Sequence, residues 1–593
     1  MNLPSLFRIA RPVCATASAG LLLTLLSACA VNPPAPSSVA PATPALVEPN
    51  ATLTPIEAKK QAAIEAREQA QYQIMLGEMA AGRHDPETAA HEFLGALSYY
   101  KDAELASRTT SLALTANDAD LAEAAADRWL EIDPSAIDAR EILARLALRR
   151  GSVADTLTQC QAIASANADG PGKGVLYVAH LLGQANNAEA VTALAVMDKL
   201  VAQYPQLADA QQAMGLLALH FGKPQLAEAA ARDAMRLEPK NQDYAFLLVG
   251  ALVKQNRFDD ADQQMARLLG HSTQAADLHM GYARLLLESG QSERARAQLQ
   301  LLLKKKPDDP DAHYALGVMA LNDKQFDEAE RQFKPLLKGR RGLDAAYQMG
   351  LVEEARKNFP AALSYYETVT RGNSAIDAAV HRAYILAQIG RVDEAQGIMQ
   401  DLRAQVPPLA QRFYLTEGDL LTNANQGARA LAVYNEALDQ YPDDADLLYG
   451  RSLVYERSGQ VELAEKDLRT IIAANADDAR ALNALGYMLT EHSKRYDEAR
   501  KLIARALVLD PDDGAIMDSM GWVQYQLGED AAALKQLQQA YDKFPDPEVA
   551  AHLGEVMWQL GDKQDARAVW DKALKQAPDQ PALLETIKRL DKK

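Results

Sequence analysis

The sequence contains little of what disulfide-stabilised proteins and most enzymes require. Its 593 residues include three cysteines and only 6% aromatic residues. Three cysteines cannot form a disulfide framework. Gly-rich phosphate loops, HExxH and CxxC patterns and alternating β-branched runs are also missing. We therefore expect almost no sheet, no enzymatic activity, no cofactor and no small-molecule substrate.

Basic residues are outnumbered by acidic ones: the sequence has 62 Lys and Arg residues and 80 Asp and Glu residues, which gives a formal net charge of −18. Such a balance argues against nucleic-acid binding, although solubility alone would also account for it. His84 and His91 lie near Glu87 and Glu92, a pattern that resembles a metal site. Scattered histidines in turns are much commoner, so we predict no metal site.

The region 479–578 contains three copies of one pattern. Glycines recur 35 and 33 residues apart and prolines 34 and 33 residues apart, at Gly486, Gly521, Gly554 and Pro511, Pro545, Pro578. Apolar residues surround each glycine at i, i+3, i+4 and i+7 spacing, which predicts one buried helical stripe. A fixed period of this size, with small residues at the same places, is typical of a tetratricopeptide (TPR) array.

Each glycine costs its helix about 1 kcal/mol relative to alanine, so its recurrence indicates a close helix crossing. We expect the second helix of each hairpin to pack there through Ala499, Ala533 or Ala566. Aligned backward, the pattern gives about fifteen helix-turn-helix units between residues 70 and 579. The sequence thus predicts an all-α TPR superhelical solenoid. The third and fourth units match poorly near Gly170, which predicts a joint in the spiral.

Residues 1–28 have the features of an export signal, with basic residues before an apolar stretch. Its end, Leu26-Ser27-Ala28-Cys29, resembles a lipobox, the motif of a bacterial lipoprotein signal. The alternative is an ordinary secretory signal cut after a small residue. The resemblance implies that Cys29 is acylated, and Ala30 after it favours the outer membrane, facing the periplasm. Residues 29–53 are Pro- and Ala-rich, which predicts a disordered tether.

A separate helix is expected over residues 54–69. Thr54, Pro55 and Glu57 have the spacing of a helix N-cap followed by a capping box. This weakly amphipathic helix either caps the first repeat or docks on a partner. At the other end, residues 580–593 are expected to form a C-terminal cap helix, and Cys160 falls at a core position of its unit.

In a TPR hairpin the first helices line the concave face, and positions 5, 9 and 12 point into it. Aromatic residues gather in these rows, where Tyr and Trp favour protein contacts, and carboxylates such as Glu354 and Glu456 accompany them. The alternative is that the rings fill gaps between successive first helices. Tyr384 and Phe246 also lie in these rows; the strongest candidates for a partner-binding groove are Tyr314, Tyr347, Tyr449, Asn483, Tyr487, Asp518, Trp522, Tyr525, Glu555 and Trp558.

Two segments resemble the large TPR lipoproteins of proteobacteria, of the LbcA adaptor type. They are Asn483-Ala484-Leu485-Gly486-Tyr487 and Asp518-Ser519-Met520-Gly521-Trp522, considered with the lipobox and the long array. The resemblance implies an outer-membrane adaptor that binds a periplasmic carboxy-terminal processing protease and presents cell-wall hydrolases to it. The alternative is an assembly factor for an envelope machine, such as a pilus secretin or a polysaccharide exporter.

Overall fold

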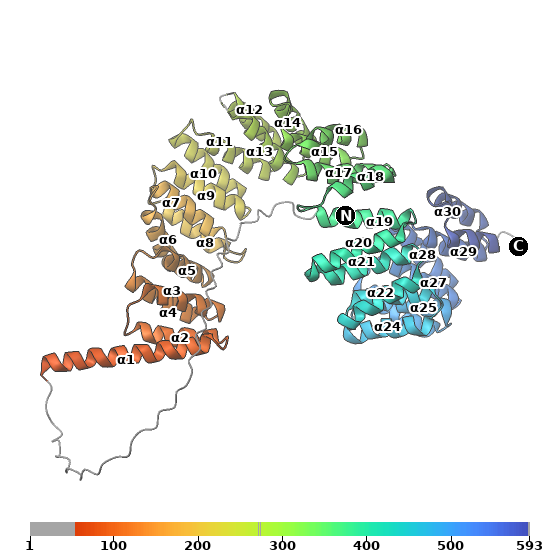
Figure 1. The fold of residues 1–593 in the computed structure, drawn as a ribbon. Coiled ribbons are helices and arrows are strands. Elements are labelled where there is room, and N and C mark those ends of the chain that lie inside the picture. Colours follow the sequence, from red (N-terminus) through yellow and green to blue (C-terminus); the bar gives the residue numbers. More distant parts are fainter. Residues whose placement is uncertain (1–53, 271, 273, 591–593) are drawn as a thin grey trace, which may run out of the picture. The chain divides into compact units, whose positions relative to one another are not determined.

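A computed structural model describes residues 54–270, 272 and 274–590, which are helical and contain no strand (Figure 1). The chain divides into two compact units, Met1–Pro134 and Ser135–Lys593. The predicted signal (1–28) and tether (29–53), including Cys29, lie outside the described residues. Within the described ranges, no helix combines the length and the apolar character needed to cross a bilayer.

The described part of unit 1 consists of two helical hairpins. Thr54 caps the first helix as predicted: its hydroxyl accepts from the Glu57 amide at 3.3 Å, and its own amide donates to the Glu57 carboxylate at 3.0 Å. The four helices are α1 (Pro55–Ala81), α2 (Pro86–Leu97), α3 (Ala103–Thr115) and α4 (Ala119–Ile132).

The helix boundary expected near residue 69 is wrong, because α1 continues past it. The helix runs without a break from Pro55 to Ala81, because the sequence is rich in Ala, Glu and Gln and has no helix breaker where the boundary was expected. Its first half is exposed, and Ala70 is its first buried residue. The first half therefore extends beyond the hairpin core and does not cover it.

Unit 2 continues the same arrangement with thirteen further hairpins, stacked in chain order (Figure 1). Counted with the two hairpins of unit 1, the described helices α1 to α30 form fifteen pairs, which confirms the predicted architecture. The helices are α5 (Ile137–Arg149), α6 (Val153–Ala166), α7 (Pro171–Leu182), α8 (Ala190–Val201), α9 (Ala208–His220), α10 (Pro224–Leu237), α11 (Gln242–Lys254), α12 (Phe258–Leu269), α13 (Ala275–Glu288), α14 (Ser292–Lys305), α15 (Pro310–Asn322), α16 (Phe326–Phe333), α17 (Gly342–Ala355), α18 (Phe359–Thr368), α19 (Ala375–Gln388), α20 (Val392–Gln405), α21 (Ala410–Asn423), α22 (Gly427–Gln440), α23 (Ala445–Arg457), α24 (Val461–Ala474), α25 (Ala479–His492), α26 (Tyr496–Leu509), α27 (Gly514–Gln526), α28 (Asp530–Lys543), α29 (Pro547–Leu560), α30 (Lys563–Gln576) and α31 (Pro581–Leu590), with 3-10 turns η1 (Lys334–Lys338) and η2 (Pro407–Leu409).

The recurring glycines lie at close crossings, as predicted, and the structure shows what fills the space. A Cβ placed on Gly521 would lie 2.6 Å from Leu537 Cγ, and one on Gly350 would lie 2.3 Å from the ring of Tyr366. Both partners occupy repeat position 24 in the second helix, one turn beyond the crossing alanine. The glycine thus makes room for a large buried side chain as well as for the approach of the helices.

The irregular region near Gly170 does not divide the structure. Gly170 has a φ of +94° and precedes Pro171, which starts α7. Helix α8 contacts α6 and α9 more than it contacts α7, so the fourth hairpin is open. These helices nevertheless belong to unit 2, and the boundary between the units lies at Pro134 and Ser135. The irregular sequence at Gly170 thus corresponds to an open hairpin whose helices share a core with their neighbours, and a joint in the spiral at this point stays a prediction.

Candidate protein-binding surface

The first helices of successive hairpins form the inner side of unit 2. The hydroxyl of Tyr487 in α25 donates to Glu548 Oε1 in α29 at 2.6 Å, across the intervening helix α27. Side chains bridge alternate helices only where those helices converge, so this side is the inside of the curve. We define the inner face as repeat positions 5, 9 and 12 of the first helices α15, α17, α19, α21, α23, α25, α27 and α29.

The inner face is negatively charged. It holds no lysine or arginine at its three positions, whereas it holds five carboxylates: Glu354, Asp419, Glu456, Asp518 and Glu555. Among the described residues, only Glu555 pairs with an arginine, Arg589 of α31, at 2.8 Å. The other four accept hydrogen bonds from tyrosine or contact histidine. This composition complements a partner that carries basic groups.

Trp522 is covered within the chain. Its ring stacks on His552 with centroids 4.1 Å apart, and its Nε1 donates to Glu491 at 2.5 Å. Only 7% of the residue is exposed. The prediction of an open groove anchor at this position is therefore wrong for the unbound chain, because a first helix one hairpin later supplies a ring that covers it.

Trp558 is also covered, with 9% of the residue exposed. It stacks on Trp570, with centroids 5.5 Å apart, and Lys563 Nζ lies 4.9 Å from its ring centroid. For Trp522 and Trp558 the alternative interpretation holds, since both rings fill space between helices.

Asp518 and Glu555 are likewise buried, at 6% and 4% exposure. Asp518 lies 3.0 Å from His552 Nδ1, and Arg589 compensates Glu555. Burial lowers the pKa of His552, but the Asp518 carboxylate outweighs burial and holds that pKa above its usual range. Both carboxylates therefore have internal partners and are not free to receive a ligand in this state.

The other six predicted residues are half-buried, with part of each side chain accessible. Arginines cover two of the rings: Arg341 lies 4.6 Å from the centroid of Tyr314, and Arg480 lies 4.4 Å from that of Tyr449. The amide oxygen of Asn483 has no hydrogen-bond partner within the described ranges. The six are Tyr314, Tyr347, Tyr449, Asn483, Tyr487 and Tyr525.

A pocket of about 750 Å³ opens on the inner face between α17, α19 and α21. Glu354 and Tyr384, two residues of the predicted rows, lie in its wall. The pocket also includes His381 and Asn423, which the sequence analysis did not identify. Repeat position 24 could have pointed to this site. Its residues are otherwise apolar or small, and only Tyr366 and Tyr434 are tyrosines there; both donate to inner-face carboxylates.

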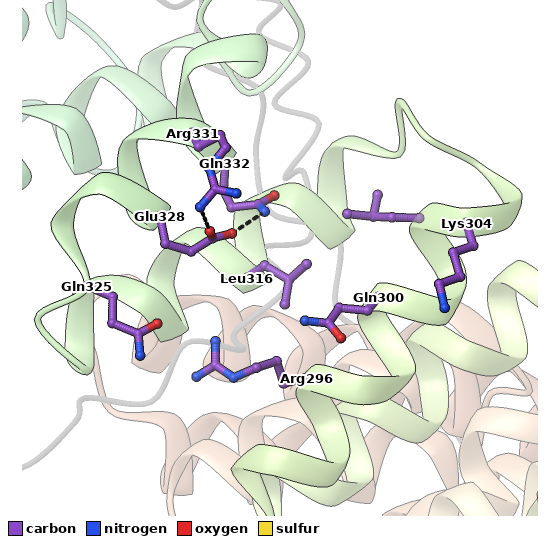
Figure 2. A pocket seen from close by; sticks show the side chains of 9 residues that line it. Arg296, Gln300, Lys304, Leu316, Gln325, Glu328, Arg331 and Gln332 are labelled. Atoms are coloured by element: carbon purple, nitrogen blue, oxygen red, sulfur yellow. Dashed lines mark hydrogen bonds and ion pairs between the residues drawn. The ribbon is translucent and has the colours of Figure 1, made fainter.

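A second pocket, of about 490 Å³, lies between α14, α15 and α16 (Figure 2). It is lined mainly by side chains of second helices, outside the predicted rows. Glu328 pairs there with Arg331 and accepts from Gln332 Nε2 at 2.6 Å, and Arg296 pairs with Asp323. The lining holds three basic side chains, Arg296, Lys304 and Arg331, and one carboxylate, Glu328.

The histidine region of unit 1 brings three polar groups together. Ligand atoms of Glu87, His91 and Asp118 lie within 4.8 Å of one another. Asp118 also caps α4 by accepting from the Leu121 amide at 2.9 Å. All three are at least partly exposed. Cys160, by contrast, is fully buried, and burial raises the pKa of its thiol to about 12, as expected for a core residue.

Two curated relatives from Pseudomonas aeruginosa match parts of the chain. TPR repeat-containing protein PA4667 is 48% identical over 171 residues, which cover 29% of each chain. Type IV pilus assembly protein PilF is 27% identical over 139 residues, which cover 23% of this chain and 55% of PilF. The matched regions thus span less than two thirds of either relative.

A solved structure of a thermophilic TPR protein from Thermus thermophilus aligns with 31% of this chain and 98% of its own, at 25% identity and a TM-score of 0.28. The tetratricopeptide repeat family model matches residues 213–277, 246–303, 282–342, 344–410, 415–467, 449–514 and 519–581, more than half of the sequence. Such repeats generally act as surfaces for binding other proteins. The chain belongs to the tetratricopeptide repeat family.

Proposed function

We propose that this protein is a non-enzymatic scaffold that binds protein partners on its inner face. The observation that carries the proposal is the composition of that face, where carboxylates and half-exposed tyrosines replace the apolar residues of the core. Stacked repeats provide an extended binding surface of this kind. Tyrosines such as Tyr347 and Tyr449 supply large contact areas with a polar end.

The proposal includes a lipid anchor at Cys29 in the outer membrane. Its support is the lipobox sequence and the absence of an aspartate after Cys29. Several acyl chains on one cysteine would hold the protein stably at the membrane. The Pro-rich residues 29–53 would then separate the repeats from the bilayer surface and leave them in the periplasm.

We further propose that the scaffold presents clients, such as cell-wall hydrolases, to a carboxy-terminal processing protease. This rests on the resemblance to LbcA-type adaptors. A scaffold that binds protease and client together makes their encounter intramolecular, which raises the effective concentration of one for the other. The scaffold then promotes cleavage without any catalytic group of its own.

A second candidate function is assembly of an envelope machine. The observation that favours it is the similarity of 139 residues to the type IV pilus assembly protein PilF. A secretin or another pilus component would then occupy the inner face. The two functions differ in their partners and not in the mode of binding.

Site-specific photo-crosslinking in cell envelopes tests these proposals. A photoreactive residue replaces Tyr449 on the inner face, and a control replaces Val508, which is 81% exposed on the second helix α26. Crosslinks from position 449 to a processing protease and to hydrolases support the adaptor, and crosslinks to a secretin support the second function. Equal labelling from positions 449 and 508 would contradict partner binding on the inner face.

A further inference from the structure

The pocket between α17, α19 and α21 contains a carboxylate with one unoccupied oxygen. Glu354 Oε2 accepts from the Tyr366 hydroxyl at 2.7 Å and lies 3.0 Å from His381 Nδ1. Within the described part of the chain, Glu354 Oε1 has no hydrogen-bond partner. Burial raises the pKa of Glu354, but the bonds to His381 and Tyr366 outweigh burial and hold it below the usual range. The group is therefore charged at neutral pH.

Asp419 on α21 repeats the arrangement. Its Oδ1 accepts from the Tyr434 hydroxyl at 2.7 Å, and Oδ2 has no partner among the residues described. Burial raises the pKa of this carboxyl. No lysine or arginine of the described chain forms an ion pair with either Glu354 or Asp419. A cation that entered the pocket would meet the Glu354 carboxylate in its wall, whose only ion-pair partner among the described residues is His381, and Asp419 lies next to the lining residue Leu420.

The hairpin geometry explains how each carboxylate is held. Tyr366 and Tyr434 cross from the second helix to the first beside Gly350 and Gly418, where any side chain would collide with the ring. Their hydroxyls then reach the inner side. Phe333 occupies the same place in an earlier hairpin and has no hydroxyl to offer, so the arrangement belongs to these two hairpins.

Tyr384 of α19 lies between the two carboxylate-bearing helices. It is 41% exposed and lines the pocket. Burial, and then the charge of Asp419, raises the pKa of its hydroxyl, and the charge of Arg412 acts in the opposite direction. Its exposed ring offers a surface on which a planar cation can stack.

We propose that this pocket binds an arginine side chain from an extended segment of a partner protein. The guanidinium donates to Glu354 and stacks on Tyr384, and Asp419, next to the lining residue Leu420, adds negative charge beside the pocket. Its planar fork suits carboxylates and aromatic faces better than a lysine ammonium does. The pocket is larger than one side chain, so it also has room for the partner's main chain next to the arginine. Side-chain amides of the pocket bind that main chain; they belong to Gln388, Asn423, Asn425 and Gln426. This inference rests on the proposed function, since it names the chemistry of the partner.

Defined peptides test the inference directly. The probe is a fluorescein-labelled nine-residue peptide of glycine and serine with one central arginine, bound to the full-length protein in detergent and followed by fluorescence polarisation. A matched peptide carries citrulline, which keeps the shape of arginine and loses its charge. We expect the arginine peptide to bind about tenfold more tightly. Equal binding of both peptides, or of a lysine peptide and the arginine peptide, would overturn the assignment.

Variants of the pocket provide the second arm. Glu354→Gln is expected to reduce arginine binding to the citrulline level, whereas Glu462→Gln, at an exposed position of α24, is expected to leave it unchanged. Circular dichroism verifies that each variant is folded. Asp419→Asn removes negative charge beside the pocket and is the second variant if Glu354→Gln is unstable. A folded variant of either kind that keeps the full preference for arginine would contradict the pocket.

The two proposals can fail separately. Partner proteins crosslinked from position 449, with no preference for arginine among the peptides, would overturn the pocket and leave the scaffold function. A clear preference for arginine that Glu354→Gln removes, without any protein crosslinked from position 449, would support the pocket and overturn the scaffold function.

Discussion

Replacing Gly521 with leucine tests the packing within the hairpins. Gly521 is buried in α27, opposite α28. A Cβ at this position would lie 2.6 Å from Leu537 Cγ, 2.9 Å from its Cδ2 and 3.1 Å from its backbone nitrogen. A new rotamer of Leu537 can move the first two atoms but not the third. Helix α28 must therefore shift away from α27 to accept the substitution.

Two opposing effects determine how much Gly521→Leu changes the local stability. Leucine favours the helix by about 1 kcal/mol relative to glycine. Overpacking of a filled core costs roughly 1–3 kcal/mol and sometimes more. Because leucine adds further carbons where a single Cβ already collides, the cost lies towards the upper end. We expect a net local destabilisation of about 1–2 kcal/mol.

Hydrogen exchange measured by mass spectrometry resolves this effect helix by helix. Protection in α27 and α28 is expected to fall by a factor of about 5–30 in Gly521→Leu. Gly397→Leu is the control, because Gly397 lies in α20 with nothing within 4 Å of an added Cβ. That variant is expected to increase protection locally. Unchanged protection around Gly521, or the same response in both variants, would refute the packing argument.

Arg403→Met is expected to destabilise unit 2 by about 3–5 kcal/mol, because it leaves Glu417, whose side chain is 1% exposed, without its guanidinium; urea unfolding followed by circular dichroism measures this. The raised pKa of His552 predicts a pH dependence. Its contribution to stability is complete below about pH 6.5, the ordinary histidine pKa, and is lost as pH rises through the raised value. Exchange of α29, corrected for intrinsic rates, should therefore be faster at pH 8 than at pH 6, and Asp518→Asn should remove the difference. Asp444→Ala removes the N-cap of α23 and should cost about 1 kcal/mol, seen as faster exchange in its first turn.

The repeat architecture could be predicted because its signal is local and periodic. Glycine and alanine recur where two neighbouring helices cross, and carboxylates recur where helices begin. Asp444 and Asp513 are examples: they accept from the amides of Leu447 and Ile516, each at 2.9 Å. Each of these features depends on residues within one hairpin, so one period of sequence contains the information.

The period did not predict where the first helix begins or how neighbouring hairpins pack. The break expected near residue 69 assumed that the array begins with a new helix, whereas α1 continues across it. That error is local, because no helix breaker stands near residue 69. Near Gly170 the period is irregular, and it does not show that α8 packs mainly on α6 and α9. Packing against the next hairpin decides whether an irregular segment is a boundary, and the period alone does not contain that information.

The same limit explains which aromatic residues of the inner face stay accessible. Trp522 and Tyr384 occupy the same repeat position, yet they are 7% and 41% exposed. His552, at position 6 of the following first helix, stacks on Trp522. The equivalent residue after Tyr384 is Thr416, which has no ring to cover it. A helical position therefore predicts the direction of a side chain, and the residue one hairpin later determines whether a partner can reach it. Tyr384 is consequently more accessible to a partner than the tryptophans of the last two hairpins.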